Sequence, residues 1–491
     1  MSPEVEISPL SLPPRVSAGE FPFPRHVHLL GVGGAGVSGL ARHLAARGLR
    51  VSGHDRSAPE NARELEQAGI VLASGESAAA LLPAAAELVV RSAAVSAEDP
   101  QVRAARARGI PVWKYAEALG KLAPVGRTLA VAGTHGKTGS SWMLWHALEG
   151  IGEAFGLPMP GAQIGGACRR NRTNAIPARD GAFFCAEACE YDRSFLQLAP
   201  AGALVTNVEA DHLDYYGTFA AIQEAFARFV DRVEADGIVV LGREVSAAVE
   251  HAVRGTVWRL GRELSPELLA ETRGAFAMRL IGPGWATPRF QLAIPGHFSV
   301  ENASLAVALA VGITVRRTGL PARDVAAAAA RGIERFQGVA RRFEPWGEVG
   351  GTHVVHDYAH HPTEVRVTLE AARRAFPRMK LCVLFQPHQH SRTARFLEDF
   401  AEALRQADHV TVADVYGARA HVEGELHAGA PELVLALKRR GVAAVLGGAP
   451  AAAVRVFAHH TPAQAAAFVL GAGDIDRQRE ALLAELGQRG R

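Results

Sequence analysis

Short apolar runs alternate with glycine-rich turns and helical stretches from about residue 26 onward. Residues 26–31 have the pattern of a short buried strand, because valine and leucine dominate it and glycines follow at once. Residues 37–48 have a helical pattern, and a second strand at 50–53 ends at Asp55. A strand, a glycine turn, a helix and a strand ending in an acid predict a parallel βαβ unit with a right-handed crossover.

The same alternation returns twice further along the chain. An apolar strand at 128–132 opens a second unit with a glycine-rich loop and a helix at about 139–149, and a third unit begins after Gly338. We therefore expect an irregular leader at 1–24 and domains at 25–122, 123–336 and 337–491. The other expected strands are 88–92, 110–113, 181–187, 203–207, 352–357, 380–385, 409–413 and 466–470, and the other expected helices are 218–235 and 298–313.

Composition narrows the class of protein without naming a partner. Of 491 residues, 48% are hydrophobic and 21% are charged, which is typical of globular proteins and argues against a disordered or fibrous chain. The 53 basic and 50 acidic side chains nearly cancel, so no nucleic acid or other polyanion is indicated. No apolar run reaches the roughly 18 residues of a membrane span, and residues 1–24 lack the apolar segment of a signal peptide. We expect a soluble, cytoplasmic protein.

The four cysteines are too few to form a disulfide scaffold in so long a chain, so a reducing compartment fits best. We expect them to be small buried hydrophobic residues. Their proximity leaves a redox pair between Cys185 and Cys189 open, with nothing further in its favour. The four are Cys168, Cys185, Cys189 and Cys382.

The glycines after the first strand fit a dinucleotide-binding fingerprint. Gly31, Gly33 and Gly36 have the spacing that lets a backbone approach a pyrophosphate at a helix N-terminus. Asp55 lies 19 residues beyond Gly36, a spacing that suits an acid that binds a ribose. The alternative is a tight strand-to-helix turn without a ligand. The pattern does not distinguish NAD from another nucleotide diphosphate.

A second loop predicts triphosphate binding more specifically. Residues 133–138 read GTHGKT and stand between an apolar strand and a helix, which is the context of a phosphate-binding loop. We expect its amides to hold phosphates, Lys137 to neutralise the β and γ oxygens, and the Thr138 hydroxyl to ligate Mg²⁺. Val131 occupies the first glycine position of the full pattern. A coincidental Gly-Lys-Thr turn is the alternative.

Two clusters of polar side chains follow the next strands of the central unit. Because the carboxyl ends of parallel strands converge on one crevice, both clusters are expected to face the phosphate loop. Carboxylate oxygens are the ligands that Mg²⁺ prefers, and an imidazole is a less usual one. Most single acids of this kind are solvated loop charges. The candidates are Glu187, Glu190, Asp192, Glu209, Asp211, His212 and Asp214.

The third unit carries two histidine-rich motifs, 357–364 and 386–393, each directly after a strand. His360 and His361 are adjacent and cannot share one face of a regular element, so we expect them in a turn. A zinc site is conceivable, but no Cys or His spacing of the structural type supports it.

The order of these motifs resembles the Mur ligase family, the ATP-dependent amide-forming enzymes of peptidoglycan precursor assembly. The resemblance covers about residues 27–475. The motifs that carry it are 28–39 (HLLGVGGAGVSG), 133–138 (GTHGKT), 206–214 (TNVEADHLD), 341–343 (RRF), 357–364 (DYAHHPTE), 385–393 (FQPHQHSRT) and 471–475 (GAGDI).

The resemblance implies an α/β fold of three domains: a Rossmann-like N-terminal domain that binds a UDP-sugar, a central P-loop ATPase domain and a Rossmann-like C-terminal domain. It implies ATP and Mg²⁺ as cofactors, and UDP-N-acetylmuramate and L-alanine as substrates that are joined through an acyl phosphate. No nucleic-acid partner and no membrane insertion are expected, and the protein is expected to be a monomer or a homodimer.

The resemblance also implies roles for residues at matching positions. Lys137, His212, His388 and Arg392 are implied as catalytic residues, and Thr138, Glu187 and His212 as Mg²⁺ ligands, with His212 lying 25 residues beyond Glu187. The implied ATP-binding residues are Gly133, Thr134, His135, Gly136, Lys137, Thr138, Asn302, Arg341 with its neighbour Arg342, and Asp357. The implied substrate-binding residues are Gly33, Gly34, Ala35, Gly36, Ser38, Asp55 and His361.

Several positions depart from the family's pattern. Cys189 and Tyr191 stand where Asp and Ser are usual, and Ser299 stands where Asn is expected near the adenine. Gln389 replaces an Arg, which removes a cation beside the reacting groups, and residues 74–76 read SGE where a Gly-His pair is expected near the uracil. These departures bear on amino-acid specificity more than on the ligase chemistry.

Other functions remain as alternatives. A related ligase that adds a different amino acid or a recycled peptide is the nearest one, although the compact segment 191–198 favours a small substrate because peptide-recycling relatives usually have an insertion there. An NAD-dependent dehydrogenase explains the first unit but leaves the phosphate loop unused. A catalytically silent binding protein is the third alternative.

Overall fold

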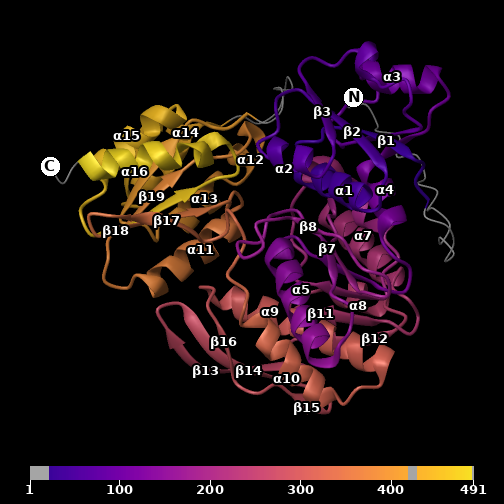
Figure 1. Cartoon of the computed structure of the whole chain (residues 1–491). Helices are drawn as coiled ribbons and strands as arrows, with labels where there is room; N and C mark the ends of the chain where they lie inside the picture. Colours follow the sequence, from indigo (N-terminus) through magenta and orange to yellow (C-terminus); the bar gives the residue numbers. More distant parts are fainter. Residues whose placement is uncertain (1–21, 418–427, 489–491) are drawn as a thin grey trace.

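A computed structural model describes residues 22–417 and 428–488, so nearly all of the expected leader at 1–24 lies outside the described residues. Strands and helices alternate along the chain and form three α/β units, each built around its own sheet (Figure 1). The predicted α/β class with three successive units is confirmed.

The N-terminal unit is a five-stranded parallel sheet covered by helices. Its elements are β1 (His26–Leu30), α1 (Ala35–Ala46), β2 (Arg50–Asp55), α2 (Ala62–Gln67), β3 (Val71–Ser74), η1 (Ala79–Leu81), β4 (Leu88–Arg91), α3 (Pro100–Ala107), β5 (Val112–Lys114) and α4 (Tyr115–Leu122). The strand order is β3-β2-β1-β4-β5, so β1 lies in the middle and the chain changes direction across the sheet on either side of it. The glycine turn after β1 therefore lies at the topological switch point, where parallel sheets place ligands.

The central unit has a seven-stranded sheet with a small antiparallel sheet beside it. Its elements are β6 (Thr128–Ala132), α5 (Lys137–Phe155), β7 (Gly161–Gln163), β8 (Ala175–Ile176), β9 (Phe184–Glu187), η2 (Tyr191–Gln197), β10 (Gly202–Val205), α6 (Leu213–Tyr216), α7 (Phe219–Asp231), β11 (Ile238–Leu241), α8 (Ala247–His251), β12 (Thr256–Arg259), β13 (Ser265–Thr272), β14 (Ala275–Gly282), β15 (Trp285–Ala286), β16 (Phe290–Leu292), α9 (His297–Thr318) and α10 (Ala322–Ile333). The order is β12-β11-β10-β6-β9-β7-β8, and β6 pairs in parallel with both β9 and β10. The loops that leave β6, β9 and β10 therefore meet at one edge.

Helices α5, α9 and α10 form the core beneath this sheet. A Cβ on Gly150 of α5 would lie 2.5 Å from the Ala328 carbonyl oxygen of α10, so glycine permits the close crossing of these helices. Within the described residues, α9 is the one helix long and apolar enough to cross a membrane, in contrast to the expectation that no segment would pass such a test. Yet 78% of its most apolar window is buried inside the protein, as in a core helix.

The C-terminal unit is a six-stranded sheet whose edge strand β17 is antiparallel to the rest. Its elements are β17 (Glu344–Val349), β18 (Thr352–Asp357), α11 (Pro362–Ala375), β19 (Leu381–Phe385), α12 (His390–Arg395), α13 (Leu397–Leu404), β20 (His409–Ala413), α14 (Ala430–Arg439), β21 (Ala443–Gly448), α15 (Pro450–His460), β22 (Ala466–Leu470), η3 (Asp474–Gln478) and α16 (Arg479–Gln488). The order is β17-β18-β22-β19-β20-β21. The two histidine-rich motifs follow β18 and β19, which lie on either side of β22.

The units differ in how they are joined. One buried apolar cluster runs from the N-terminal sheet into the central unit, so these two share a core, whereas the C-terminal unit is packed around two clusters of its own. The connection to the C-terminal unit contains Gly338, Arg341 and Phe343 with φ of 96°, 62° and 41°. The C-terminal unit is therefore the part that can move with the least loss of apolar burial.

The cysteines correct one expectation. Cys168, Cys185 and Cys382 are buried as predicted, but Cys189 is exposed, because it follows β9 in the loop beside the phosphate loop. All four are free. The structure therefore shows no disulfide between Cys185 and Cys189.

We expect the protein to lose stability in mild acid. His28, His43, His146 and His356 are buried, and burial lowers the pKa of each to about 4, below the usual 6.5. Since the unfolded chain takes up protons first, their contribution to stability is complete above about pH 6.5 and is lost as the pH falls towards 4, by up to about 1.4 kcal/mol per histidine and pH unit. Urea unfolding at pH 7 and pH 5.5 measures the loss.

A matched pair of variants isolates one of these histidines. The ring of His28 contacts Ser52 Oγ at 2.8 Å and Gln101 Oε1 at 2.9 Å, whereas His251 is exposed. His28→Gln should make the stability less dependent on pH, and His251→Gln should not change the dependence. An equal pH dependence in both variants would contradict the assignment to buried histidine.

Candidate functional site

The phosphate loop has the geometry that its sequence predicts. It leaves β6 at Gly133 and enters α5 at Lys137, with Gly136 at the N-cap in the left-handed region at φ 82°. A Cβ on Gly133 would lie 1.9 Å from Thr206 Oγ1, so only glycine fits there. Thr206 also donates to the His135 carbonyl oxygen at 2.6 Å and so fixes the loop to β10. The free amides at the start of α5 form an anion-binding N-terminus.

A cavity of about 300 Å³ opens beside this loop, bounded by the start of α9 and by the C-terminal unit. Asn302 of α9 faces the loop, since a Cβ on Gly136 would lie 2.9 Å from its Nδ2. Ser299 is buried one turn earlier and donates to the Pro295 carbonyl oxygen. Of the residues predicted to bind ATP, the cavity is lined by His135, Gly136, Lys137, Thr138, Asn302 and Asp357, together with Arg342, and not by Gly133, Thr134 and Arg341.

Arg341 and Arg342 point to different partners. The Arg341 guanidinium forms an ion pair with Asp476 within the C-terminal unit, whereas Arg342 lines the cavity. Asp357 accepts hydrogen bonds from the amides of Phe343 and Ala359, both at 2.8 Å, and burial raises its pKa to about 6. Asp357 thus holds the connecting segment in place at the edge of the cavity.

Lys137 is tied to a buried acid that sequence reasoning did not single out. Its Nζ donates to the carbonyl oxygens of Gly133 and Thr134 and lies 2.9 Å from Glu190 Oε2. Burial would lower the pKa of Lys137, but the attraction of Glu190 outweighs it, so the pKa is raised. The available signal was topological: Glu190 follows β9, and β9 pairs with β6 beside the loop.

Two predicted Mg²⁺ ligands lie on either side of a glycine pair. Glu187 Oε2 accepts a hydrogen bond from the Gly165 amide at 2.9 Å. A Cβ on Gly165 would lie 2.8 Å from Glu187 Oε1, and one on Gly166 would lie 3.0 Å from Thr138 Cγ2. Glycine at both positions leaves room beside a hydroxyl and a carboxylate. Oxygen donors of these two kinds suit Mg²⁺.

His212, the third predicted ligand, begins α6 in the left-handed region at φ 53°. Its Nε2 lies 3.7 Å from Asp211 Oδ2 and 3.9 Å from Glu190 Oε1. The Tyr191 ring packs against its imidazole with centroids 5.1 Å apart. Tyr191, which stands where the family usually has Ser, thus orients the histidine.

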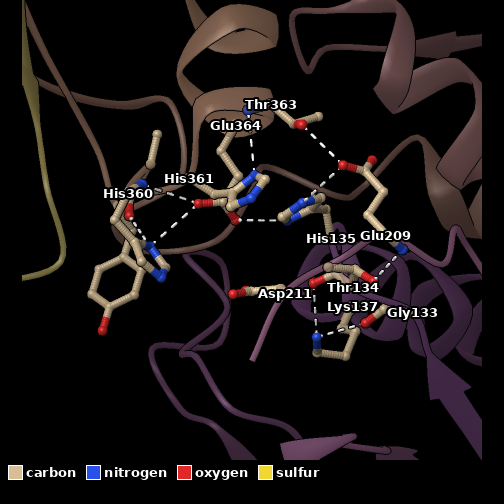
Figure 2. A network of polar contacts seen from close by, with 12 residues as sticks. Gly133, Thr134, His135, Lys137, Glu209, Asp211, His360, His361, Thr363 and Glu364 are labelled. Carbon is tan, nitrogen blue, oxygen red and sulfur yellow. Dashed lines mark hydrogen bonds and ion pairs between the residues drawn. The ribbon is translucent and has the colours of Figure 1, made fainter. Parts of the chain in front are cut away.

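The phosphate loop meets the C-terminal unit through His135 (Figure 2). Its Nε2 lies 3.6 Å from Glu209 Oε2 and its Nδ1 lies 3.4 Å from Glu364 Oε1. Thr363 Oγ1 donates to the same Glu209 carboxylate at 2.9 Å. Burial alone would lower the pKa of His135, but the two glutamates raise it to about 9, so the ring carries a proton that links the two units at neutral pH.

The residues predicted to act on the reacting groups lie on the same side. Arg392 Nη2 lies 3.0 Å from Asp211 Oδ1, and both side chains are 11% exposed, so the pair joins the central and C-terminal units. His388 does not line the cavity, and its ring stacks on Tyr416. Gln389 sits at the N-cap of α12 in the left-handed region at φ 66°.

The predicted substrate residues fall into two places. At the turn after β1, the Gly33 amide donates to Asp55 Oδ2 at 2.8 Å, while Ser38 is buried and donates to the Ala35 carbonyl oxygen. A Cβ on Gly36 would lie 2.8 Å from the Tyr115 ring, so this glycine serves close packing of α1 on α4.

His361 lies apart from this turn, at the phosphate loop. Its ring is 4.9 Å from that of His135, and its Nδ1 accepts from the Thr363 amide at 3.4 Å. His361 therefore contacts the phosphate loop and not the glycine turn.

Three protein-family models match the chain in order. The model described as Mur ligase family, catalytic domain, matches residues 26–125, the Mur ligase middle domain matches 131–310, and the Mur ligase, glutamate ligase domain, matches 341–475. Together they cover more than half of the chain.

Individual relatives agree with these matches. UDP-N-acetylmuramate–L-alanine ligase of Saccharopolyspora erythraea is 41% identical over 407 residues, covering 80% of each chain. The enzyme of the same name from Rubrobacter xylanophilus is 37% identical over 483 residues, covering 94% of this chain and all of its own. The crystal structure of UDP-N-acetylmuramate-alanine ligase from Thermotoga maritima has a TM-score of 0.76 at 24% identity, covering 95% of this chain and 100% of that one, and shows the shared fold.

Proposed function

The chain belongs to the Mur ligase family, and from this premise we propose that it joins UDP-N-acetylmuramate to L-alanine in the cytoplasm, with ATP converted to ADP and phosphate. The relatives that carry this activity in their names are 37% and 41% identical over most of the chain. The observation that carries the proposal is the cavity in which Lys137, Asn302 and Arg342 face one space.

ATP fits this cavity in one orientation. The phosphates lie against the amides of the loop 133–136 and the start of α5, because a helix N-terminus attracts anions. The adenine then reaches Asn302 and the buried turn at Ser299, since both line the far side. Arg342 approaches from the C-terminal unit and adds a cation opposite Lys137.

Thr138 and Glu187 would hold Mg²⁺, with His212 near a second one. Bound Mg²⁺ supplies charge neutralisation at the β and γ phosphates during transfer. The donor set and the room left by Gly165 and Gly166 fit this ion.

Two bonds change hands in the proposed reaction. The carboxylate of UDP-N-acetylmuramate attacks the γ phosphorus, its oxygen bonds to that phosphorus, and ADP leaves. The neutral amine of L-alanine then attacks the acyl carbon, and phosphate leaves with the former carboxylate oxygen. Lys137 stabilises the charge in the first step, and Arg392, held by Asp211, faces the acyl phosphate in the second.

Closure of the C-terminal unit protects the acyl phosphate from water. The ion pairs of His135 with Glu364 and of Arg392 with Asp211 both cross from the central to the C-terminal unit. They form only when the units are together, so they favour the closed arrangement in which hydrolysis is suppressed.

Glu190 is expected to compete with ATP for Lys137. Glu190→Gln removes the charge that holds Lys137 back, and we expect it to tighten ATP binding about tenfold, or about 1.4 kcal/mol. Isothermal titration with ATP measures the change. Asp192→Asn is the matched control, because Asp192 pairs with Lys114 at 2.7 Å and not with Lys137. Weaker ATP binding in Glu190→Gln would show that Glu190 assists ATP binding.

An amino-acid panel tests the proposed function. Purified protein with ATP, Mg²⁺ and UDP-N-acetylmuramate should release phosphate with L-alanine at a rate well above that with other amino acids. Release without UDP-N-acetylmuramate, or with no amino acid in the panel, would overturn the proposal. Preference for another amino acid or for a peptide would identify the related ligase instead.

A further inference from the structure

Three potential metal ligands from two units point to one spot beside the phosphate loop (Figure 2). His135 and Glu209 belong to the central unit, and His361 belongs to the C-terminal unit. Their ligand atoms all lie within 4.8 Å of one another. The proposed ligase chemistry uses only the His135 backbone and its link to Glu364, so it does not account for this convergence.

The imidazole nitrogens at this spot lack hydrogen-bond partners. Both ring nitrogens of His135 and Nε2 of His361 are buried without one among the described residues, apart from the longer ion-pair contacts of His135. His361 is only 6% exposed. Buried polar atoms are normally satisfied, so three such nitrogens in one place point to a ligand.

The spacing fits tetrahedral coordination. His135 Nε2 and Glu209 Oε2 are 3.6 Å apart, close to the separation of about 3.4 Å between two ligands that each lie about 2.05 Å from a tetrahedral ion. The other nitrogen of His135 faces Glu364 Oε1 at 3.4 Å, the carboxylate–histidine arrangement that orients metal-binding imidazoles. Coordination by His361 Nε2 places its proton on Nδ1 and gives up only the 3.4 Å contact with the Thr363 amide.

We propose that His135, Glu209 and His361 bind a divalent cation of the Zn²⁺ class, which ties the C-terminal unit to the phosphate loop. Two imidazoles and one carboxylate favour such an ion over Mg²⁺, whose ligands are oxygens. Three protein ligands leave a fourth position open to water. The site shares no residue with Thr138, Glu187 and His212.

Because its ligands come from both units, the cation stabilises their closed arrangement. It is expected to slow the opening that ligand exchange requires, so Zn²⁺ acts as a brake on turnover. Any agent that binds only the closed form shifts the equilibrium towards that form.

Calorimetric titration of the metal-stripped full chain with Zn²⁺, in excess Mg²⁺ and without nucleotide or UDP-sugar, tests the site. We expect one Zn²⁺ per chain with micromolar or tighter affinity, and at least a tenfold loss in both His361→Gln and Glu209→Gln. His360→Gln is the matched control, because His360 is the adjacent residue but contacts the Tyr358 carbonyl oxygen. We expect the control to bind like the unaltered protein.

A thermal melt gives a second readout. Zn²⁺ should raise the Tm of the unaltered protein and of His360→Gln, but not that of His361→Gln, and the melts without Zn²⁺ show whether each variant is folded. Absence of saturable Zn²⁺ binding, or equal binding by His361→Gln and His360→Gln, would overturn the proposal. Since neither readout requires ligase activity, failure here is separate from failure of the proposed function.

Discussion

Lys137→Ala is expected to reduce phosphoryl transfer at least a thousandfold while UDP-N-acetylmuramate still binds. Lys137 is the cation at the centre of the phosphate loop, and a phosphoryl-transfer site depends mainly on positioning and on neutralising charge. The glycine turn after β1 lies in another unit and keeps its geometry. Single-turnover formation of ADP and titration with the UDP-sugar separate the two effects.

The substitution also leaves Glu190 buried without its cation, which is destabilising in itself. The double variant Lys137→Ala, Glu190→Gln removes that charge and should recover stability without recovering activity. Lys380→Ala is the control, because Lys380 is 70% exposed and pairs with Asp408. Activity of Lys137→Ala within tenfold of the unaltered protein would rule out the role given to Lys137.

Arg392→Ala is expected to lower kcat at least a hundredfold. The change removes a cation that faces the acyl phosphate, and it leaves Asp211 buried without a partner between the central and C-terminal units. The Arg392 guanidinium holds the pKa of the Asp211 carboxyl well below its usual range, against the effect of burial. The charge of Asp211 therefore persists at neutral pH after the substitution.

Steady-state kinetics with all three substrates checks this expectation. Arg395→Ala on the same short helix is the control, because that residue is exposed. Asp211→Asn should lose less activity than Arg392→Ala, since it weakens only the position of the arginine. An unchanged kcat in Arg392→Ala, or an equal loss in Arg395→Ala, would refute the role in the second step.

Much of the fold follows from local patterns. The strands at 128–132, 352–357, 409–413 and 466–470 were predicted with their observed bounds, because each is a short apolar run or one that ends at a turn. The antiparallel sheet β13–β16 was missed. Its strand β13 is largely exposed and carries charged residues, and its pairing depends on contacts with β14 that no local pattern reveals.

The site shows a similar division. The phosphate loop, Thr138, Asn302 and Arg342 could be placed from motifs, since loop and helix positions follow from strand ends. Glu190 could not be singled out, because many acids follow β9 and β10 and only packing shows which one reaches Lys137. The convergence of His135 and His361 depends on how the C-terminal unit sits on the loop, which sequence spacing does not encode.

Isotope tracing tests the central claim most directly. UDP-N-acetylmuramate labelled with ¹⁸O in its carboxylate, incubated with the protein, ATP, Mg²⁺ and L-alanine, should give inorganic phosphate that carries one ¹⁸O atom from the sugar for each amide bond formed. Phosphate that contains no ¹⁸O while the amide still forms would contradict transfer of the γ-phosphoryl group to the carboxylate.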